Sequence, residues 1–291
     1  MQLANRIADE FSVDTALHQS VALTIAGSDC GGNAGIQADL RAFHVFGVHG
    51  CTVLSALTAQ NPWGVKAVVA SEAAFVSAQL DAVFDAYAIT AIKTGMLSSP
   101  EIIDAVADCL LLRNRIIKVI DPVMVASSGA VLLQEAAIDV LVERLLPLAM
   151  LITPNLPEVE VLTGRKVSTR AEMAEAARVL AERCNCAVLV KGGHGRMQEA
   201  VDVLFDGQAL YWLSTPRIVE PLSTHGTGCS LSAAITAACA RGECLVDAVV
   251  AGKAYVYEAI RTGVWVGEAV AVLGTPTKLP LEQVRIEIER V

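Results

Sequence analysis

Short apolar runs alternate with amphipathic stretches along most of the chain, and this alternation restricts the folds it can adopt. Strands are predicted for VALTIAG (21–27) and CTVLSALTAQ (51–60), and AIKTGML (91–97) is predicted to be a strand that leads into a loop. Buried strands that end in polar residues or glycine are predicted for IIKVIDPVM (116–124), AMLITPN (149–155) and CAVLVKGGH (186–194). Helical spacing is found at 34–47, at 71–86, where Ser71 is the expected cap, and at 98–112. Repeated strand–loop–helix units predict an α/β fold with a mainly parallel central sheet covered on both faces. Ligands of such sheets bind beyond the carboxyl ends of the strands.

A single domain is expected to hold most of the 291 residues. Hydrophobic residues make up 54% of the chain and charged residues 18%, which is enough to bury a large core. No proline-rich or Gly/Ser-rich linker, low-complexity tract or repeat divides the sequence. We therefore predict an N-terminal extension at 1–19 and one domain at 20–291, in which LEQVRIEIERV forms a terminal helix or strand.

Composition also argues against some partners and compartments. The net charge of −9 disfavours a nucleic-acid-binding surface, which needs clustered Lys and Arg. No stretch approaches about 18 uninterrupted apolar residues, and the N-terminus lacks the apolar segment of a signal peptide. We therefore expect no membrane span and a cytoplasmic location. The eight cysteines form no C-x-x-C pair, which predicts free thiols in a reducing compartment and no structural metal site.

The stretch HGTGC (225–229) precedes the small-residue segment SLSAAITAACA, which predicts a glycine turn followed by a helix. Gly226 and Gly228 allow backbone N–H groups to approach a ligand, Thr227 adds a hydroxyl, and the helix dipole favours an anion. An ordinary loop-to-helix turn is the alternative. Cys229 lies in the first helical turn, where the dipole lowers a thiol pKa and favours a thiolate that could act as a base. An inert packed cysteine is the alternative for that residue.

The stretch GSDCGGNAGIQAD (27–39) places flexible residues between a predicted strand and a predicted helix. Gly31, Gly32 and Asn33 tolerate left-handed backbone, so this loop could be a hinge or the floor of a substrate site. The dinucleotide fingerprint G-x-G-x-x-G is absent. Asp39 lies beside the apolar face of the predicted helix, either as a buried hydrogen-bonding group or as a surface carboxylate.

Three further strand ends carry polar groups suited to phosphate chemistry. Asn155 and Glu158 in TPNLPE form either a capping box or a carboxylate site for Mg²⁺, directly or through water. Asp121 is a second carboxylate at a strand end, and Lys191 has the charge and position to reach a phosphate. Together with the anion turn and the flexible loop, these residues describe a phosphoryl-transfer site, and the P-loop motif is absent.

The ordered motifs ALTIAGSD, AGIQADLRAF, LTAQN, IKTGML, DPVM, LITPNLPE, KGGH and STHGTGCSLSAA resemble those of the ribokinase-like superfamily. Within it, the chain is similar to the hydroxymethylpyrimidine/phosphomethylpyrimidine kinases of thiamine biosynthesis, from about Val21 to about Gly263. The resemblance implies a three-layer α/β fold with a mostly parallel sheet, often dimeric. It also implies two ATP-dependent, Mg²⁺-requiring transfers, one to the hydroxymethyl group of a small pyrimidine and one to the resulting monophosphate.

The resemblance also implies roles for single residues. The turn 226–228 would be the anion hole, and Cys229 would stand where many superfamily members have an Asp base. A thiolate can accept the hydroxyl proton in the first transfer, whereas a neutral thiol would avoid repelling the anionic acceptor of the second. Gln60 can present both a donor and an acceptor to an aminopyrimidine. The full assignment places Gly27, Asp39, Thr58 (often Val in the family), Gln60, Met96 and Val123 around the pyrimidine, and Asn155, Glu158 and Lys191, with the strand-end carboxylate Asp121, around ATP and Mg²⁺.

Three positions depart from the family pattern. Cys30 stands where the family usually has Pro or Ser, and Asn33 replaces a glycine. Ser127 replaces a loop lysine, because the usual AKSG is ASSG here. If that lysine assists phosphates or loop closure in relatives, this protein would be slower or less selective.

Two alternatives remain beside the pyrimidine kinase. A pyridoxine/pyridoxal kinase is the nearer one, since some family members with GTGC phosphorylate vitamin B6, although Gln60 and Met96 favour a pyrimidine. A non-catalytic protein that senses a pyrimidine is the other, and the presence of Glu158, Lys191 and Cys229 counts against it.

Overall fold

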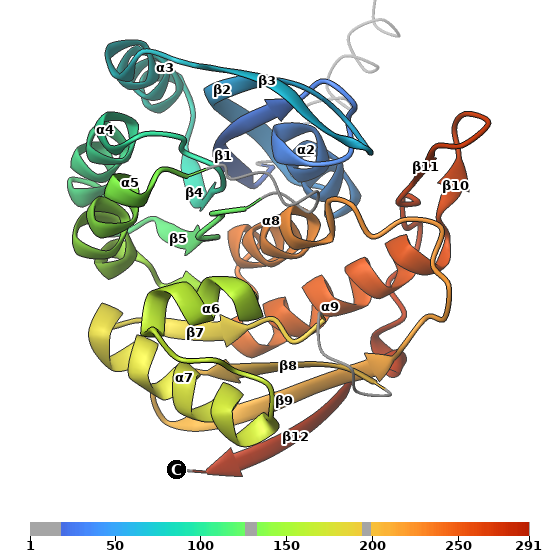
Figure 1. Ribbon diagram of the computed structural model, residues 1–291. Helices are drawn as coiled ribbons and strands as arrows, with labels where there is room; N and C mark the ends of the chain where they lie inside the picture. The colour runs from blue at the N-terminus through green and yellow to red at the C-terminus, as the bar shows by residue number, and fades with distance from the viewer. Residues whose placement is uncertain (1–18, 126–132, 194–198, 291) are drawn as a thin grey trace, which may run out of the picture.

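The computed structural model describes residues 19–125, 133–193 and 199–290 (Figure 1). Its centre is a ten-stranded sheet, and a separate two-stranded ribbon consists of β10 (Val264–Trp265) and β11 (Ala271–Val272). In spatial order the strands of the large sheet are β12 (Arg285–Arg290), β9 (Ala209–Pro216), β8 (Glu199–Phe205), β7 (Ala187–Val190), β6 (Leu151–Ile152), β5 (Ile117–Ile120), β4 (Ile89–Thr94), β1 (Val21–Asp29), β2 (His49–Asn61) and β3 (Gly64–Ala70).

The middle of the sheet is parallel, as predicted. β1 pairs in parallel with β2 and β4, and parallel pairing continues through β5, β6 and β7. Both margins are antiparallel: β3 folds back on β2, and β8, β9 and β12 extend the sheet beyond β7. The C-terminal segment, for which the sequence allowed a helix or a strand, is therefore an edge strand.

Helices cover both faces of the sheet, which confirms the predicted three-layer α/β fold (Figure 1). Each layer encloses its own buried hydrophobic cluster against the sheet. One layer contains α2 (Gly35–Val45), α8 (Thr227–Ala240) and α9 (Leu245–Arg261). The other contains α3 (Ala73–Ala86), α4 (Pro100–Leu111), α5 (Glu135–Val140), a π-helical turn (Leu141–Leu145), a 3-10 turn (Leu146–Leu148), α6 (Leu156–Thr163) and α7 (Arg170–Cys184); a further 3-10 turn, Leu281–Gln283, precedes β12.

Local side chains explain where two of the predicted helices begin. Ser99 caps α4 by accepting the Ile102 N–H at 3.4 Å, and Pro100 occupies the first turn. The predicted cap Ser71 is wrong, because Glu72 precedes α3 without a side-chain cap. The Ser71 hydroxyl instead donates to the Leu54 carbonyl at 2.7 Å and ties the start of this helix to β2.

Helix α8 is buried from Ser230 to Ala240, and its small residues make this possible. Helix α9 lies very close to it, since a Cβ added to Gly252 would be 2.7 Å from Ile235 Cγ1. The first turn of α8 reaches the edge where the parallel strands end, and Gly226 contacts Asn33 of the loop after β1 there. The fold thus brings the two glycine-rich stretches of the sequence together.

Two predictions lie outside the described residues: nearly all of the extension at 1–19, and the loop that contains Ser127. Within the described residues, no helix is both long and apolar enough to cross a membrane.

Candidate active site

The anion turn has a backbone that only glycine can provide. Gly226 has φ +88°, and a Cβ added there would lie 1.8 Å from the Asn33 carbonyl oxygen. The Ser230 N–H is the first intrahelical donor and donates to the Gly226 carbonyl at 2.9 Å, whereas the N–H groups of Gly228 and Cys229 come before it and have no acceptor within the helix. A Cβ on Gly228 would lie 3.5 Å from Lys191 Nζ. Backbone donors and an ammonium group therefore converge on one spot, as an anion site requires.

Lys191 and Asp121 form a buried ion pair beside this turn. Lys191 Nζ donates to Asp121 Oδ1 at 2.7 Å, and both residues follow the ends of central strands. The Asp121 carboxylate also accepts from Thr153 at 3.0 Å and from Ser232 of α8 at 3.1 Å. Burial lowers the pKa of Lys191, but the nearby carboxylates of Asp121 and Glu158 outweigh burial and raise it. Lys191 thus stays a fixed positive charge at the anion site.

A second buried ion pair joins Lys93 of β4 to Asp39 of α2. Lys93 Nζ lies 2.8 and 2.9 Å from the two Asp39 oxygens, and the Thr24 hydroxyl donates to Asp39 at 2.6 Å. Neither Lys93 nor Asp39 has exposed surface. This corrects the expectation that Asp39 lines the pyrimidine pocket: the buried hydrogen-bonding alternative is what the structure contains. Sequence reasoning missed Lys93, although a lysine within an otherwise apolar strand needs a buried partner.

Cys229 lies among these charges and is half-buried. Burial raises the pKa of its thiol, the positive charge of Lys93 lowers it, and the negative charges of Asp39 and Asp121 raise it again. The backbone N–H of Gly35 also donates to the sulfur. The net result is a raised pKa, so the expectation that the helix dipole yields a thiolate is wrong for the resting site. Burial and the two carboxylates outweigh Lys93 and the Gly35 N–H, and the resting Cys229 is a neutral thiol.

Glu158 forms the capping box with Asn155, which is the first of the two alternatives predicted from the sequence. The Asn155 N–H donates to Glu158 Oε2 at 2.8 Å, and the Glu158 N–H donates to Asn155 Oδ1 at 2.9 Å. The backbone N–H of Met124 is a further donor to this carboxylate. Burial raises the pKa of Glu158 to about 7, although Lys191 opposes the shift. Glu158 therefore sits beside the anion site as a buried acid that titrates near neutrality.

Asp29 organises the flexible loop and was not predicted. Its carboxylate accepts the N–H groups of Gly31 at 2.8 Å and of Asn33 and Ala34 at 2.9 Å. Burial alone would raise the pKa of Asp29, but hydrogen bonds from His225 and the loop lower it. His225 Nε2 lies 3.6 Å from Asp29 Oδ2, so this residue joins the two glycine-rich stretches. The signal in the sequence was an Asp at a strand end directly before three flexible residues.

The residues predicted for the pyrimidine pocket are brought together only in part. Gly27 lies against Met96, since an added Cβ would be 2.7 Å from Met96 Cε. The Thr58 hydroxyl is used within the sheet, where it donates to the Ser28 carbonyl at 2.9 Å. The Cys30 thiol donates to the Gln60 carbonyl at 3.2 Å and accepts the Gln60 N–H at 3.4 Å, which fixes the Gln60 backbone beside the loop. Val123 is half-buried two residues after Asp121, at the same sheet edge.

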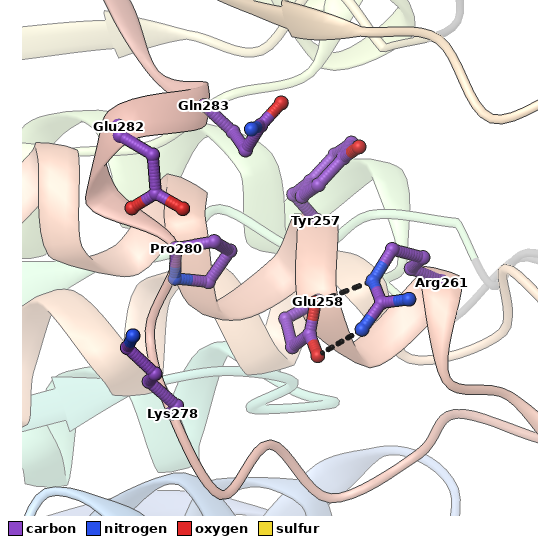
Figure 2. A pocket seen from close by; sticks show the side chains of 7 residues that line it. All are labelled: Tyr257, Glu258, Arg261, Lys278, Pro280, Glu282 and Gln283. Atoms are coloured by element: carbon purple, nitrogen blue, oxygen red, sulfur yellow. Dashed lines mark hydrogen bonds and ion pairs between the residues drawn. The ribbon is translucent and has the colours of Figure 1, made fainter.

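A surface hollow lies elsewhere, against the end of α9 (Figure 2). Its volume is about 310 Å³. Arg261 donates to both carboxylate oxygens of Glu258 there, each at 2.7 Å. The hollow is lined by Tyr257, Glu258, Arg261, Lys278, Pro280, Glu282 and Gln283, and none of these is a predicted site residue.

The family model and the curated relatives agree on one family. The family model described as phosphomethylpyrimidine kinase matches residues 29–273. A hydroxymethylpyrimidine/phosphomethylpyrimidine kinase of Rhizobium meliloti is 52% identical over 244 residues, covering 83% of this chain and 90% of that protein. The thiamine biosynthesis bifunctional protein ThiED of Geobacter sulfurreducens is 47% identical over 258 residues, 89% of this chain and 52% of that protein. The solved structure of the Staphylococcus aureus pyridoxal kinase with ADP superposes with a TM-score of 0.84 at 32% identity, covering 94% of this chain and 99% of that chain.

Proposed function

Because this chain belongs to the phosphomethylpyrimidine kinase family, we propose that the centre around Cys229, Lys191 and the 226–228 turn is its phosphoryl-transfer site. The activity is the ATP-dependent phosphorylation of 4-amino-5-hydroxymethyl-2-methylpyrimidine and then of its monophosphate, in thiamine biosynthesis. The observation that carries the site proposal is the convergence of the free N–H groups of Gly228 and Cys229 with the Lys191 ammonium. Negative charge on a transferring phosphoryl group would be stabilised there.

In the first transfer, the acceptor is a hydroxyl group and its proton must leave as the new P–O bond forms. The Cys229 sulfur lies in the first turn of α8, at the anion turn, and can take this proton once it has lost its own. In the second transfer, the acceptor is an anionic phosphate oxygen that needs no base. The resting neutral thiol then suits the second acceptor, since it adds no negative charge beside it.

Mg²⁺ is part of the same proposal, and the carboxylates of Glu158 and Asp121 suit binding of the ion through water better than direct coordination. Within the described residues, no cluster of three or more His, Cys, Asp or Glu forms a metal cage. The Glu158 and Asp121 oxygens are already used by backbone N–H groups, hydroxyls and Lys191. Mg²⁺ usually binds substrate phosphates and waters with only one or two carboxylates, so Glu158 would hold the ion through water. When bound, the ion neutralises phosphate charge.

The pyrimidine pocket is proposed on Gly27, Met96 and Gln60. Gly27 and Met96 form one wall, and the Cys30 thiol holds the Gln60 backbone at the loop. The Gln60 amide can donate and accept at once, as an aminopyrimidine edge requires. Thr58 and Val123 would border this pocket, whereas Asp39 is held in its buried ion pair with Lys93.

A pyridoxal kinase is the second candidate, because the S. aureus pyridoxal kinase has the same fold over 94% of this chain. A single assay separates the two functions. Protein with Mg²⁺ and ATP is offered hydroxymethylpyrimidine, its monophosphate and pyridoxal in separate tubes, and products are identified by mass spectrometry. We expect a pyrophosphate product from the pyrimidine monophosphate. Product from pyridoxal alone would overturn the proposal in favour of the second candidate.

We also propose a homodimer formed through the edge strand β3. Val68 and Val69 of this strand are exposed, and Leu57, paired with Val69 on β2, is 56% exposed. An exposed apolar edge strand is a liability unless a partner covers it. Sedimentation of wild type and Val69→Lys tests this proposal. We expect a dimer that the substitution dissociates, and a wild-type monomer would exclude the homodimer.

The compartment is also part of the proposal. The eight free cysteines support a reducing, cytoplasmic compartment.

A further inference from the structure

Two buried ion pairs flank Cys229, and the proposed function explains only one of them. Lys191 with Asp121 lies at the anion turn and has a role toward phosphate. Lys93 with Asp39 has no exposed surface at all, so neither residue can touch ATP or an acceptor in this structure. Burying two charges is costly, and an apolar pair of similar size would usually serve the fold as well. We therefore looked for a role of the Lys93–Asp39 pair in the proton transfer proposed for Cys229.

The geometry of α2 places this pair next to the sulfur. The Gly35 N–H, at the start of α2, donates to the Cys229 sulfur. Asp39 lies four residues later, one turn along the same face of the helix, where it holds Lys93 Nζ at 2.8 and 2.9 Å. One helical turn thus carries contacts to both Cys229 and Lys93. Gly95 makes room for the lysine, since a Cβ there would lie 2.9 Å from Lys93 Nζ.

The charges that face Cys229 come from four elements and balance. Lys93 reaches it from β4, Asp39 from α2, Asp121 from the end of β5 and Lys191 from the end of β7. Two ammonium groups and two carboxylates sum to zero charge, and Lys93 has the largest charge effect on the sulfur. A small change at either pair then alters the cost of a negative charge on it. In the proposed function Lys191 binds the phosphates. Lys93 is therefore the buried cation whose charge acts mainly on Cys229.

We infer that Lys93, held in place by Asp39, is a positioning residue that decides whether the Cys229 sulfur keeps or releases its proton. The inference deepens the proposed function, in which Cys229 is the base of the first transfer. The thiol proton passes to water; the thiolate, stabilised by Lys93, then takes the proton of the acceptor hydroxyl as the P–O bond forms and ADP leaves. Asp39 restrains Lys93, so the thiol stays neutral in the resting site.

Opposite changes in two variants test this role without any turnover. Asp39→Asn keeps the shape but removes the negative charge and one of the two acceptor oxygens, so the thiolate fraction of Cys229 should rise. Lys93→Met removes the positive charge, so the fraction should fall. The measurement is the rate of iodoacetamide alkylation at the Cys229 peptide, followed by mass spectrometry at pH 7 to 9. We expect a change of about threefold to tenfold in each direction, because one pKa unit is tenfold in thiolate.

Two controls separate charge from general loosening. Thr24→Val removes the hydroxyl that donates to Asp39 but changes no charge, so Cys229 alkylation should stay within about twofold of wild type. Exposed Cys30 and Cys244 report reactivity away from this pair in the same digest. Loosening would speed alkylation in every variant, whereas Lys93 control gives opposite signs. If Lys93→Met does not fold, the comparison of Cys229 alkylation rates between Asp39→Asn and Thr24→Val is sufficient to test the role of Lys93.

The outcomes for the inference and for the proposed function differ. Equal Cys229 alkylation in Asp39→Asn, Thr24→Val and wild type would overturn the Lys93 inference, whatever the kinase assay gives. A shifted alkylation rate supports it. If the rate shifts but the pH profile of the first transfer does not move with it, the role of Cys229 as base fails while control of the thiol by Lys93 stands.

Discussion

Lys191 Nζ lies 2.7 Å from Asp121 Oδ1, although seventy residues separate the two in the chain. The pair fixes an ammonium beside Gly228 at the start of α8. Replacing Lys191 with Met should lower kcat/KM by about 100-fold or more, because one charged group aimed at the transferring phosphoryl is removed. Lys191→Arg keeps the charge and should recover part of the activity. Steady-state kinetics with varied ATP measures both.

Misfolding is the competing explanation for loss of activity in Lys191→Met, since a buried Asp121 would remain unpaired. The double variant Lys191→Met with Asp121→Asn removes both charges and should regain thermal stability without regaining activity. Recovery of activity in the double variant would show that Lys191 serves the fold rather than the phosphate.

The raised pKa of the Cys229 thiol predicts different pH profiles for the two transfers. Burial places this pKa above its ordinary value, so the thiolate fraction grows about tenfold per pH unit between pH 7 and 9. The first transfer, which needs a base, should accelerate over this range, whereas the second should stay nearly flat. Cys229→Ala should therefore slow the first transfer by about 100-fold and the second by much less. Separate assays with the alcohol and with the monophosphate measure this, and parallel profiles would contradict it.

The sequence predicted the strands of the sheet centre and the clustering of their polar ends, because both follow from local pattern and from parallel topology. It could not give the partners of Asp39 and Lys93, which lie 54 residues apart and meet only through the packing of α2 on the sheet. The direction of the pKa shift of the Cys229 thiol was predicted wrongly for the same reason. The helix dipole is visible in the sequence, whereas burial and the carboxylates around the sulfur arise from tertiary structure.

Gly226 should tolerate no side chain, for two reasons that can be separated. Its φ of +88° strains any L-residue, and a Cβ would also lie 1.8 Å from the Asn33 carbonyl oxygen. Gly207 provides the matched control, with φ +93° and open space around it. Gly207→Ala should cost about 1 kcal/mol and Gly226→Ala clearly more, with loss of kinase activity in the latter alone. Urea unfolding of both variants measures the difference. Equal losses in the free energy of unfolding would mean that the loop of Asn33 moves to make room for the added Cβ.

Glu158 should make the protein less stable as the pH rises toward neutrality. Its pKa is about 7 in the folded state, against an ordinary 4.5, so the folded chain keeps a proton that the unfolded chain releases between these values. The contribution of this group to the free energy of unfolding therefore falls by roughly 3 kcal/mol from pH 4.5 to 7. Glu158→Gln, which preserves the capping geometry, should remove this dependence and gain stability relative to wild type at pH 8.

The other capping box in the chain isolates the effect of burial at Glu158. Glu172 caps α7 through the same pattern with Thr169, but it is exposed, and backbone hydrogen bonds lower its pKa to about 2. Its stabilising effect is lost only as the pH falls below the ordinary carboxyl range, so Glu172→Gln should leave the slope between pH 5 and 8 unchanged. Denaturant unfolding at pH 5, 6, 7 and 8 compares the three proteins. A Glu158→Gln slope parallel to wild type would show that Glu158 is ionised throughout, held so by Lys191.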